Sequence, residues 1–169
     1  FFKQKTAYEI PKRDWSSDVC SSDLIAARLT EQGVPYRAAL TTRPGDARTL
    51  AELARGQGFR AVVCVGGDGT INEVVNGLRW SDGTLDTSVP LGIIPRGTAQ
   101  DFAQGLDIPL TMPMALDRLL QGEARPVDVG RITFADGSSR LFVNVVGVGF
   151  DRSEEHTSEL QSRFGISYA

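Results

Sequence analysis

The chain has 169 residues and a formal net charge of -3, with 41% hydrophobic and 23% charged side chains, which excludes a disordered or fibrous chain. No stretch approaches the roughly 18 apolar residues of a membrane-spanning helix, and an isoelectric point near 5.2 argues against a nucleic-acid partner. Two cysteines are too few for a disulfide framework or a zinc site, so we expect a reducing compartment.

The two ends of the chain differ in composition from its middle. All three lysines lie within the first 13 residues, whereas every basic residue from Arg28 to Arg140 is an arginine. The ends also match translated DNA-sequencing primers at residues 3–10 and 14–24, and the reverse complements of those primers at residues 152–162 and 166–169. We therefore expect residues 1–24 and 152–169 to be adapter-derived, the first of them disordered, and the genuine segment to be a fragment lacking both natural termini and its N-terminal strand.

The genuine segment begins with signals for a helix, a strand and a turn. Residues 25–32 have apolar side chains at helical spacing, and Gly33 favours a helix end directly after them. Residues 36–41 are a strand candidate, and residues 42–46 have the composition of a turn. Asp46 is expected to cap a helix over residues 47–55, with an apolar face formed by Leu50, Leu53 and Ala54.

Strand and helix signals then alternate along the middle of the chain. The apolar run at residues 61–65 is typical of a strand covered on both faces, and residues 91–94 form a second buried strand candidate. The expected helices carry Ile71, Val74, Val75 and Leu78 on one side, begin near Asp101, and span residues 114–120. This alternation predicts an α/β fold with a parallel sheet between layers of helices.

The pattern changes from Val127 onward. Residues 129–134 and 140–146 are β-rich and are separated by a hairpin signal with Asp136 and Gly137 at its tip. We interpret residues 25–126 as an α/β nucleotide-binding domain and residues 127–151 as the start of a truncated β-sandwich domain.

A glycine-rich turn, Val65-Gly66-Gly67-Asp68-Gly69-Thr70, leaves one predicted strand and opens the next helix. Backbone N–H groups and the positive end of a helix then converge at the carboxyl edge of the sheet, which favours phosphate binding. Asp68 would repel a bare phosphate but suits a magnesium ion or a hydroxyl that must lose its proton. The alternative is a tight strand-to-helix turn with a capping Asp68 and no ligand.

Two common phosphate-binding patterns are missing from this turn. The genuine segment has no lysine for a Walker motif, and the G-x-G-x-x-G dinucleotide fingerprint does not occur. Phosphate would therefore be held by backbone amides, hydroxyl groups and a metal ion.

Four ordered motifs carry a family resemblance. Residues 66–78 (GGDGTINEVVNGL) and residues 91–103 (LGIIPRGTAQDFA) resemble the catalytic domain of the diacylglycerol kinase family, within the group of lipid, sphingosine and NAD kinases. Residues 41–47 (TTRPGDA) resemble its T-x-x-x-G-D/H-A element, and residues 127–151 resemble the entry to its second domain. The resemblance covers nearly all of the genuine segment and implies a three-layer NAD kinase/diacylglycerol kinase-like fold.

The resemblance also implies roles for particular residues. Thr41 and Thr98 would contact ATP, and the phosphates would be wrapped by Gly66, Gly67, Asp68, Gly69, Thr70, Ile71 and Asn72. Asp68 would lie near the transferred phosphoryl group as a metal-linked or proton-accepting carboxylate. The main general base and the acidic magnesium loop would lie beyond Asp151, so no metal ligand is assigned and the chain is expected to be inactive as written.

Several positions near these motifs have alternative interpretations. Gln100 replaces the usual Asn of the second motif, which puts a tight contact from this position in doubt. Arg96 is interpreted as solvated rather than phosphate-bound, while Asn72 and Glu73 either support the turn or are exposed polar residues. Cys64 is expected in the core, and Met112 and Met114 are expected to pack rather than to bind lipid.

The leading hypothesis is a lipid kinase that uses ATP and Mg²⁺ to phosphorylate the hydroxyl of diacylglycerol or a related lipid. Such an enzyme would be cytoplasmic, peripheral to the inner face of the membrane, and a homodimer is an open possibility. The rivals are an NAD kinase, which shares the GGDGT turn, and a nucleotide-binding regulatory module without transfer activity.

Overall fold

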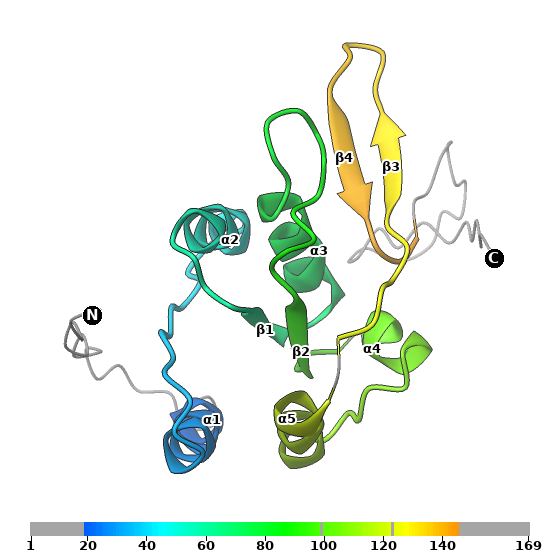
Figure 1. Ribbon diagram of the computed structural model, residues 1–169. Helices are drawn as coiled ribbons and strands as arrows, with labels where there is room; N and C mark the ends of the chain where they lie inside the picture. The colour runs from blue at the N-terminus through cyan, green and yellow to red at the C-terminus, as the bar shows by residue number, and fades with distance from the viewer. Residues whose placement is uncertain (1–18, 99, 123, 146–169) are drawn as a thin grey trace. The chain divides into compact units, whose positions relative to one another are not determined.

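The structure is a computed structural model that describes residues 19–98, 100–122 and 124–145. Its contacts divide the chain into two units, Phe1–Ala38 and Ala39–Ala169, which we describe separately. The expectations for residues 1–18 and 146–169 lie outside the described residues. Figure 1 gives the helices and strands in chain order.

The first unit contains helix α1, Val19–Glu31. It ends shortly before Gly33, as expected, and the φ of 65° at Gly33 allows the backbone to turn back, with the N–H of Val34 bonded to the carbonyl of Leu29 at 2.9 Å. The expectation of disorder up to residue 24 is wrong for residues 19–24, which are helical. Each residue added to an existing helix gains a backbone hydrogen bond at little further cost, so the helix extends beyond its apolar stretch.

The predicted strand at residues 36–41 is not formed. This stretch has no regular secondary structure, and Tyr36 and Leu40 are exposed. A strand requires backbone bonds to a neighbouring strand, and the part of the chain that the structure describes provides no such partner here.

Helix α2, Asp46–Gly56, opens the second unit, and its buried face differs from the predicted one. Ala47 and Ala51 are buried, whereas Leu53 is 55% exposed. The reason is the close packing of α2 on α3, Asp68–Gly77: a Cβ atom added at Gly77 would overlap the carbonyl oxygen of Arg48 and lie 2.7 Å from the Cβ of Ala51. Only small side chains fit between backbones this close.

Strands β1, Val62–Gly66, and β2, Leu91–Pro95, pair in parallel with Val62 opposite Leu91, as the sequence predicted. Cys64 and Ile93 belong to one core cluster with Ile71, Val74 and Leu78 of the α3 segment. Strand β1, however, is not covered on both faces, because Val63 and Val65 are 42% and 43% exposed.

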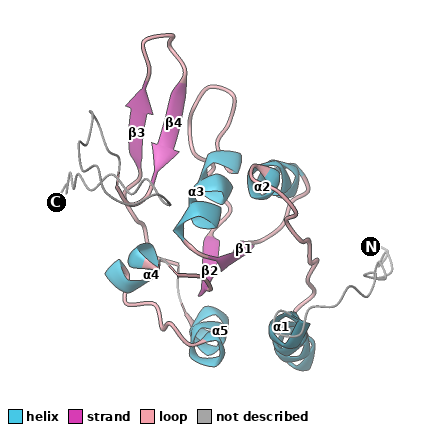
Figure 2. Ribbon diagram, turned by 180° about the vertical axis from the view of Figure 1, so that it is seen from behind, coloured by secondary structure: helices cyan, strands magenta, loops and turns pink. Residues whose placement is uncertain are grey.

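The opposite face of β2 is covered by helix α5, Met112–Gln121. A Cβ atom at Gly92 would overlap the side chain of Leu119, and Ile94, Ala115 and Leu116 are almost completely buried. Helices therefore lie on both sides of the parallel sheet, with the second layer placed over β2, which confirms the three-layer α/β architecture (Figures 1 and 2). The short helix α4, Asp101–Gly105, begins where the sequence predicted.

Strands β3, Gly130–Thr133, and β4, Ser139–Phe142, form the predicted antiparallel hairpin. Gly137 at its tip has a φ of 81°, a conformation that favours glycine. The hairpin lies against α3 (Figure 2), where the guanidinium of Arg79 donates to the carbonyl and hydroxyl oxygens of Ser139 at 2.7 and 2.9 Å.

Candidate functional site

The glycine-rich turn and the loop after β2 meet at one edge of the sheet. Because β1 and β2 are parallel neighbours, their carboxyl ends lie together, and the N–H of Arg96 donates to the carbonyl of Gly66 at 2.9 Å. Gly97 has a φ of 129°, and a Cβ atom there would lie 3.6 Å from the Cα of Gly67. The two motifs begin 25 residues apart in the sequence, at Gly66 and Leu91. In the structure they form one continuous site.

The N-terminus of α3 forms the centre of this site. Gly67 precedes the helix in an extended conformation, and no side chain caps the helix start. The first N–H groups of a helix have no acceptor within that helix, and the helix dipole makes this end positive. The turn therefore offers directed donors and a favourable potential to an anion such as phosphate.

Two residues of the turn shape its backbone. A Cβ atom at Gly66 would lie 2.9 Å from the side chain of Thr70, so this position has no room for a larger residue. Ile71 is 1% exposed and its N–H bonds to the carbonyl of Gly67 at 3.1 Å. Ile71 was expected to contact phosphate, but its side chain is buried in the core and its backbone N–H is bonded to Gly67.

Asp68 connects α3 to α4. Its carboxylate accepts hydrogen bonds from the backbone N–H groups of Asp101, at 3.0 Å, and Phe102, at 3.2 Å. Asp68 is half-buried, and it caps the start of α4 rather than the start of its own helix. A carboxylate has about four lone-pair positions, so the two that remain can still face a metal ion or a hydroxyl group.

Gln100 and Thr98 lie on the loop that follows β2. The side-chain amide of Gln100 donates to the carbonyl of Gly97 at 2.8 Å, so its longer arm folds back on its own loop. Thr98 is exposed on the same loop.

The turn before α2 is held by Asp46. Its carboxylate accepts from the N–H and hydroxyl groups of Thr42, both at 2.9 Å, and from the N–H of Arg43 at 3.1 Å. These bonds, first of all the one from the Thr42 backbone, lower the pKa of Asp46 to about 2. The expected cap of α2 by Asp46 is wrong, since the carboxylate bonds backward to the turn and Gly45 precedes the helix.

Glu73 links this turn to the glycine-rich turn. Its carboxylate accepts from the N–H of Gly45 at 3.0 Å, so the segment that begins at Thr41 lies beside the first turns of α3. Glu73 is thus a support of the site rather than an exposed polar residue. Thr41 itself is exposed.

Asn72 lies two residues after the glycine-rich turn. Its side-chain oxygen is buried and has no hydrogen-bond partner among the described residues, while its backbone carbonyl accepts from the side chain of Asn76 at 2.8 Å. Asn76, which is 6% exposed, is not among the residues predicted from the sequence to form the site. A signal was present: an Asn in the buried stripe of a predicted helix must find hydrogen-bond partners elsewhere.

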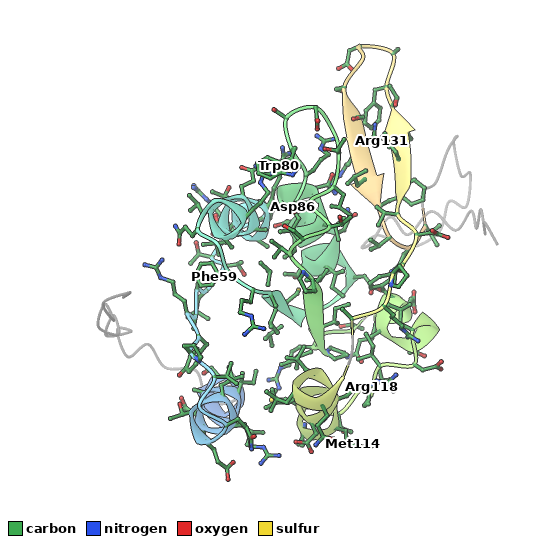
Figure 3. The ribbon with its side chains drawn as sticks, viewed as in Figure 1. Phe59, Trp80, Asp86, Met114, Arg118 and Arg131 are labelled. Carbon is green, nitrogen blue, oxygen red and sulfur yellow. The ribbon has the colours of Figure 1, made fainter. Side chains whose placement is uncertain are left out.

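The remaining expectations concern a cysteine and two methionines. Cys64 is buried as predicted, and burial raises its thiol pKa to about 12, so it is protonated and inert. Met114 is 60% exposed on α5 rather than packed, whereas Met112 is half-buried (Figure 3). The cause is the helical period, which turns Ala115 and Leu116 to the sheet and Met114 to solvent.

The donors of the site fit a metal-bound phosphate better than a metal held by the protein alone. Within residues 19–98, 100–122 and 124–145, no group of three or more His, Cys, Asp or Glu side chains could hold a metal ion. Magnesium commonly uses one or two carboxylates together with phosphate oxygens and water, which Asp68 beside the turn would allow. The described residues also contain no helix with the length and apolar character needed to cross a membrane.

Comparisons with known proteins agree with these features. The family model described as diacylglycerol kinase catalytic domain matches residues 17–132. The chain is 37% identical over 140 residues to a diacylglycerol kinase of Bacillus subtilis, covering 82% of this chain and 43% of that protein. It is 34% identical over 143 residues to a diacylglycerol kinase of Staphylococcus saprophyticus, covering 83% and 44%.

A solved structure described as a diacylglycerol kinase from Bacillus anthracis is similar in fold. Its TM-score is 0.50 at 30% sequence identity, and the match covers 62% of this chain and 33% of that one. The chain therefore spans less than half the length of the curated relatives it matches.

Proposed function

The chain belongs to the diacylglycerol kinase catalytic-domain family, and we propose that it is the nucleotide-binding part of a lipid kinase that uses ATP to phosphorylate the hydroxyl group of diacylglycerol or a related lipid. The observation that carries the proposal is the meeting of the Gly66–Thr70 turn and the Arg96–Gln100 loop at one sheet edge, within a family whose relatives are diacylglycerol kinases.

The phosphates of ATP would bind at the N-terminus of α3. Backbone N–H groups of the turn would surround the terminal phosphates, and the absence of a Cβ atom at Gly67 and Gly69 allows the phosphoryl oxygens to come close. A Cβ atom at Gly69 would meet no atom within 4 Å, so the space over this residue is open to a ligand.

Asp68 would act beside the transferred phosphoryl group. When bound, Mg²⁺ would neutralise charge on the phosphates. The backbone bonds from Asp101 and Phe102 restrict the direction of the Asp68 carboxylate, and its remaining lone pairs would face the phosphates. The group that accepts the proton of the lipid hydroxyl is expected beyond Asp151, outside the described residues.

Thr41 and Thr98 would contact the nucleotide from two sides. Both are exposed. Thr41 precedes the turn that is held to α3 by the Glu73–Gly45 bond, and Thr98 lies on the loop that is held to β1 by the Arg96–Gly66 bond. The lipid would be presented at a membrane surface on the cytoplasmic side.

The deciding experiment measures transfer of labelled phosphate from ATP in a protein that carries this segment together with the second domain of its relatives. Diacylglycerol in mixed micelles, other lipid alcohols and NAD are compared as acceptors, and labelled lipid is the expected product. Labelled product with NAD alone would assign the chain to NAD kinases. ATP binding without transfer to any acceptor would favour the regulatory module.

A further inference from the structure

Asn76 is a buried amide in the interior of a helix. It is 6% exposed, in a helix interior where Asn is less favourable than Ala, Leu or Glu, and where an unpaired amide would be costly. Its side chain is fully paired. The amide nitrogen donates to the carbonyl of Leu141 at 2.8 Å, and the N–H of Leu141 donates to the amide oxygen at 2.9 Å.

The same amide nitrogen donates to the backbone carbonyl of Asn72 at 2.8 Å. One side chain therefore bonds to strand β4 on one side and, on the other, to the carbonyl of Asn72, one helical turn earlier in α3 and two residues after the glycine-rich turn. Two bonds to Leu141 form the pattern that a neighbouring strand would make, so Asn76 attaches the hairpin to α3 in a single register.

Hydrogen bonds to Asp68 and Glu73 hold α3 to the start of α4 and to Gly45, and Asn76 adds the bonds to the hairpin. Ile71, Val74 and Leu78 hold the helix by apolar packing, which is roughly proportional to area and has no preferred direction. Hydrogen bonds to a strand do have direction, and they set both the rotation of α3 and its position along its axis.

We propose that Asn76 is a positioning residue that couples the β3–β4 hairpin to the phosphate-binding turn. It holds α3 so that the amides of its first turn face the phosphates, and a displacement of the hairpin is transmitted to the turn through the carbonyl of Asn72. The phosphate part of this inference rests on the proposed function. The mechanical part stands on the three hydrogen bonds of Asn76.

The test replaces Asn76 by Asp, which has the same shape and loses the two amide N–H donors. At neutral pH the carboxylate would face the carbonyl oxygens of Leu141 and Asn72 without a proton between them. Amide hydrogen exchange is measured by NMR on the full 169-residue chain. We expect exchange at Leu141 to be about 100-fold faster and exchange at Ile71, which closes the turn, about tenfold faster.

The pH dependence separates this role from a loss of packing. A protonated Asp is isosteric with Asn and regains one donor, and burial raises the pKa of such a carboxyl. After correction for intrinsic exchange, the rates at Leu141 and Ile71 in Asn76→Asp should return toward those of the unsubstituted chain as pH falls from 7 to 4. Rates that stay equally high at pH 4 would overturn the proposal.

Two control variants complete the design. Val75→Ala removes buried volume next to Asn76 and serves as a match for the loss of thermal stability, with no expected pH recovery. Arg79→Met removes the bonds to Ser139 but leaves the three hydrogen bonds of Asn76 in place, so exchange at both Leu141 and Ile71 should stay within about twofold. Equal acceleration of Ile71 in Asn76→Asp and in either control would contradict the coupling.

Titration with Mg-ATP tests the functional part on the same samples. If the unsubstituted chain binds, Asn76→Asp should weaken binding about tenfold at pH 7, while Val75→Ala changes it less than about twofold. Equal weakening would contradict the role in phosphate binding. If the unsubstituted chain does not bind Mg-ATP, the proposed function fails here, while the exchange data still decide the coupling.

Discussion

The carboxylate of Asp68, the first residue of α3, accepts a hydrogen bond from the backbone N–H of Asp101, the first residue of α4, at 3.0 Å. Two helices that follow different strands therefore start at the same side chain. This contact gives Asp68 a measurable structural role beside its proposed role in phosphoryl transfer, and substitutions can separate the two.

Asp68→Asn should keep one of the two bonds to α4, because the amide has one acceptor oxygen. We expect the free energy of unfolding to fall by about 1 kcal/mol, a usual value for a lost helix cap. Phosphoryl transfer in the complete enzyme should fall by far more than this stability loss accounts for, because the charge beside the phosphoryl group is removed.

Asp82→Asn is the matched control for this substitution. Asp82 also accepts two hydrogen bonds, from the N–H and hydroxyl of Thr84, in an exposed turn outside the site. Urea unfolding and labelled-phosphate transfer are measured on both variants. Equal transfer rates in Asp68→Asn and Asp82→Asn would leave Asp68 with its structural role alone.

Gly69→Asp places a carboxylate over the glycine-rich turn, where we propose that phosphate binds. The position is open and its φ is not positive, so the variant should fold. Repulsion between the carboxylate and phosphate should weaken Mg-ATP binding by about 100-fold or more. Gly56→Asp, at the end of α2 and equally open, should bind within about threefold of the unsubstituted protein. Calorimetric titration of the two variants makes the comparison, and similar affinities would argue against phosphate at this turn.

Gly77→Ala should destabilise the contact between α2 and α3. The added methyl group would overlap the carbonyl of Arg48 and crowd Ala51, at a cost of about 1–3 kcal/mol. Alanine otherwise favours a helix by about 1 kcal/mol over glycine, so the net loss should be about 0–2 kcal/mol. Gly56→Ala has no such overlap and should be neutral or stabilising. Chemical denaturation of both variants checks the difference, and a stabilised Gly77→Ala would contradict the packing described.

The turn before α2 should lose stability in acid. The pKa of Asp46 is lowered to about 2 in the folded protein, and an unperturbed Asp has a pKa near 3.9. Below pH 4 the unfolded state therefore binds more protons than the folded state, so the contribution of Asp46 is complete above about pH 4 and is lost as pH falls through about 2.

Asp46→Asn should remove this pH dependence. Exchange of the Thr42 amide, which bonds to the Asp46 carboxylate, is followed from pH 5 to pH 2 in both proteins. An Asp46 carboxyl that titrates at its ordinary pKa would show that the hydrogen bonds from Thr42 and Arg43 do not persist in solution.

Cys64 should not react with alkylating reagents in the folded protein. Burial raises its thiol pKa to about 12, and the thiolate is the reactive form. A Cys20→Ser background removes the other thiol, and mass spectrometry then measures iodoacetamide labelling at pH 8 with and without denaturant. Rapid labelling of the native protein would contradict the close packing of β1 against α3.

Local sequence patterns were sufficient to predict the elements whose apolar side chains or turn residues follow a regular spacing. The buried face of α3, the parallel pairing of β1 with β2, and the hairpin around Gly137 all follow from spacing and turn composition. The strand at residues 36–41 could not be judged in this way, because a strand depends on a partner elsewhere in the chain.

The location of the candidate site could be predicted from the sequence, but the hydrogen bonds within it could not. The glycine-rich turn located it, whereas Asp68 bonding to residues 101 and 102 depends on two segments meeting in space. Asp46 was expected to cap its own helix because the unpaired N–H groups of the first helical turn are its nearest donors in sequence. The N–H groups of Thr42 and Arg43, in the turn before the helix, bond to its carboxylate instead. The pair of Asn76 and Leu141 spans 65 positions, beyond any local pattern.

The side-chain amide of Gln100 donates to the carbonyl of Gly97, three residues earlier in the loop between β2 and α4. This bond restricts the conformation of the loop. Shortening that arm by one methylene, as in Gln100→Asn, would leave the carbonyl to water or to an incoming nucleotide. Replacement of Gln by Asn at position 100 would therefore change the rigidity of the loop before it changed any ligand contact. Gln and Asn are not equivalent at this position.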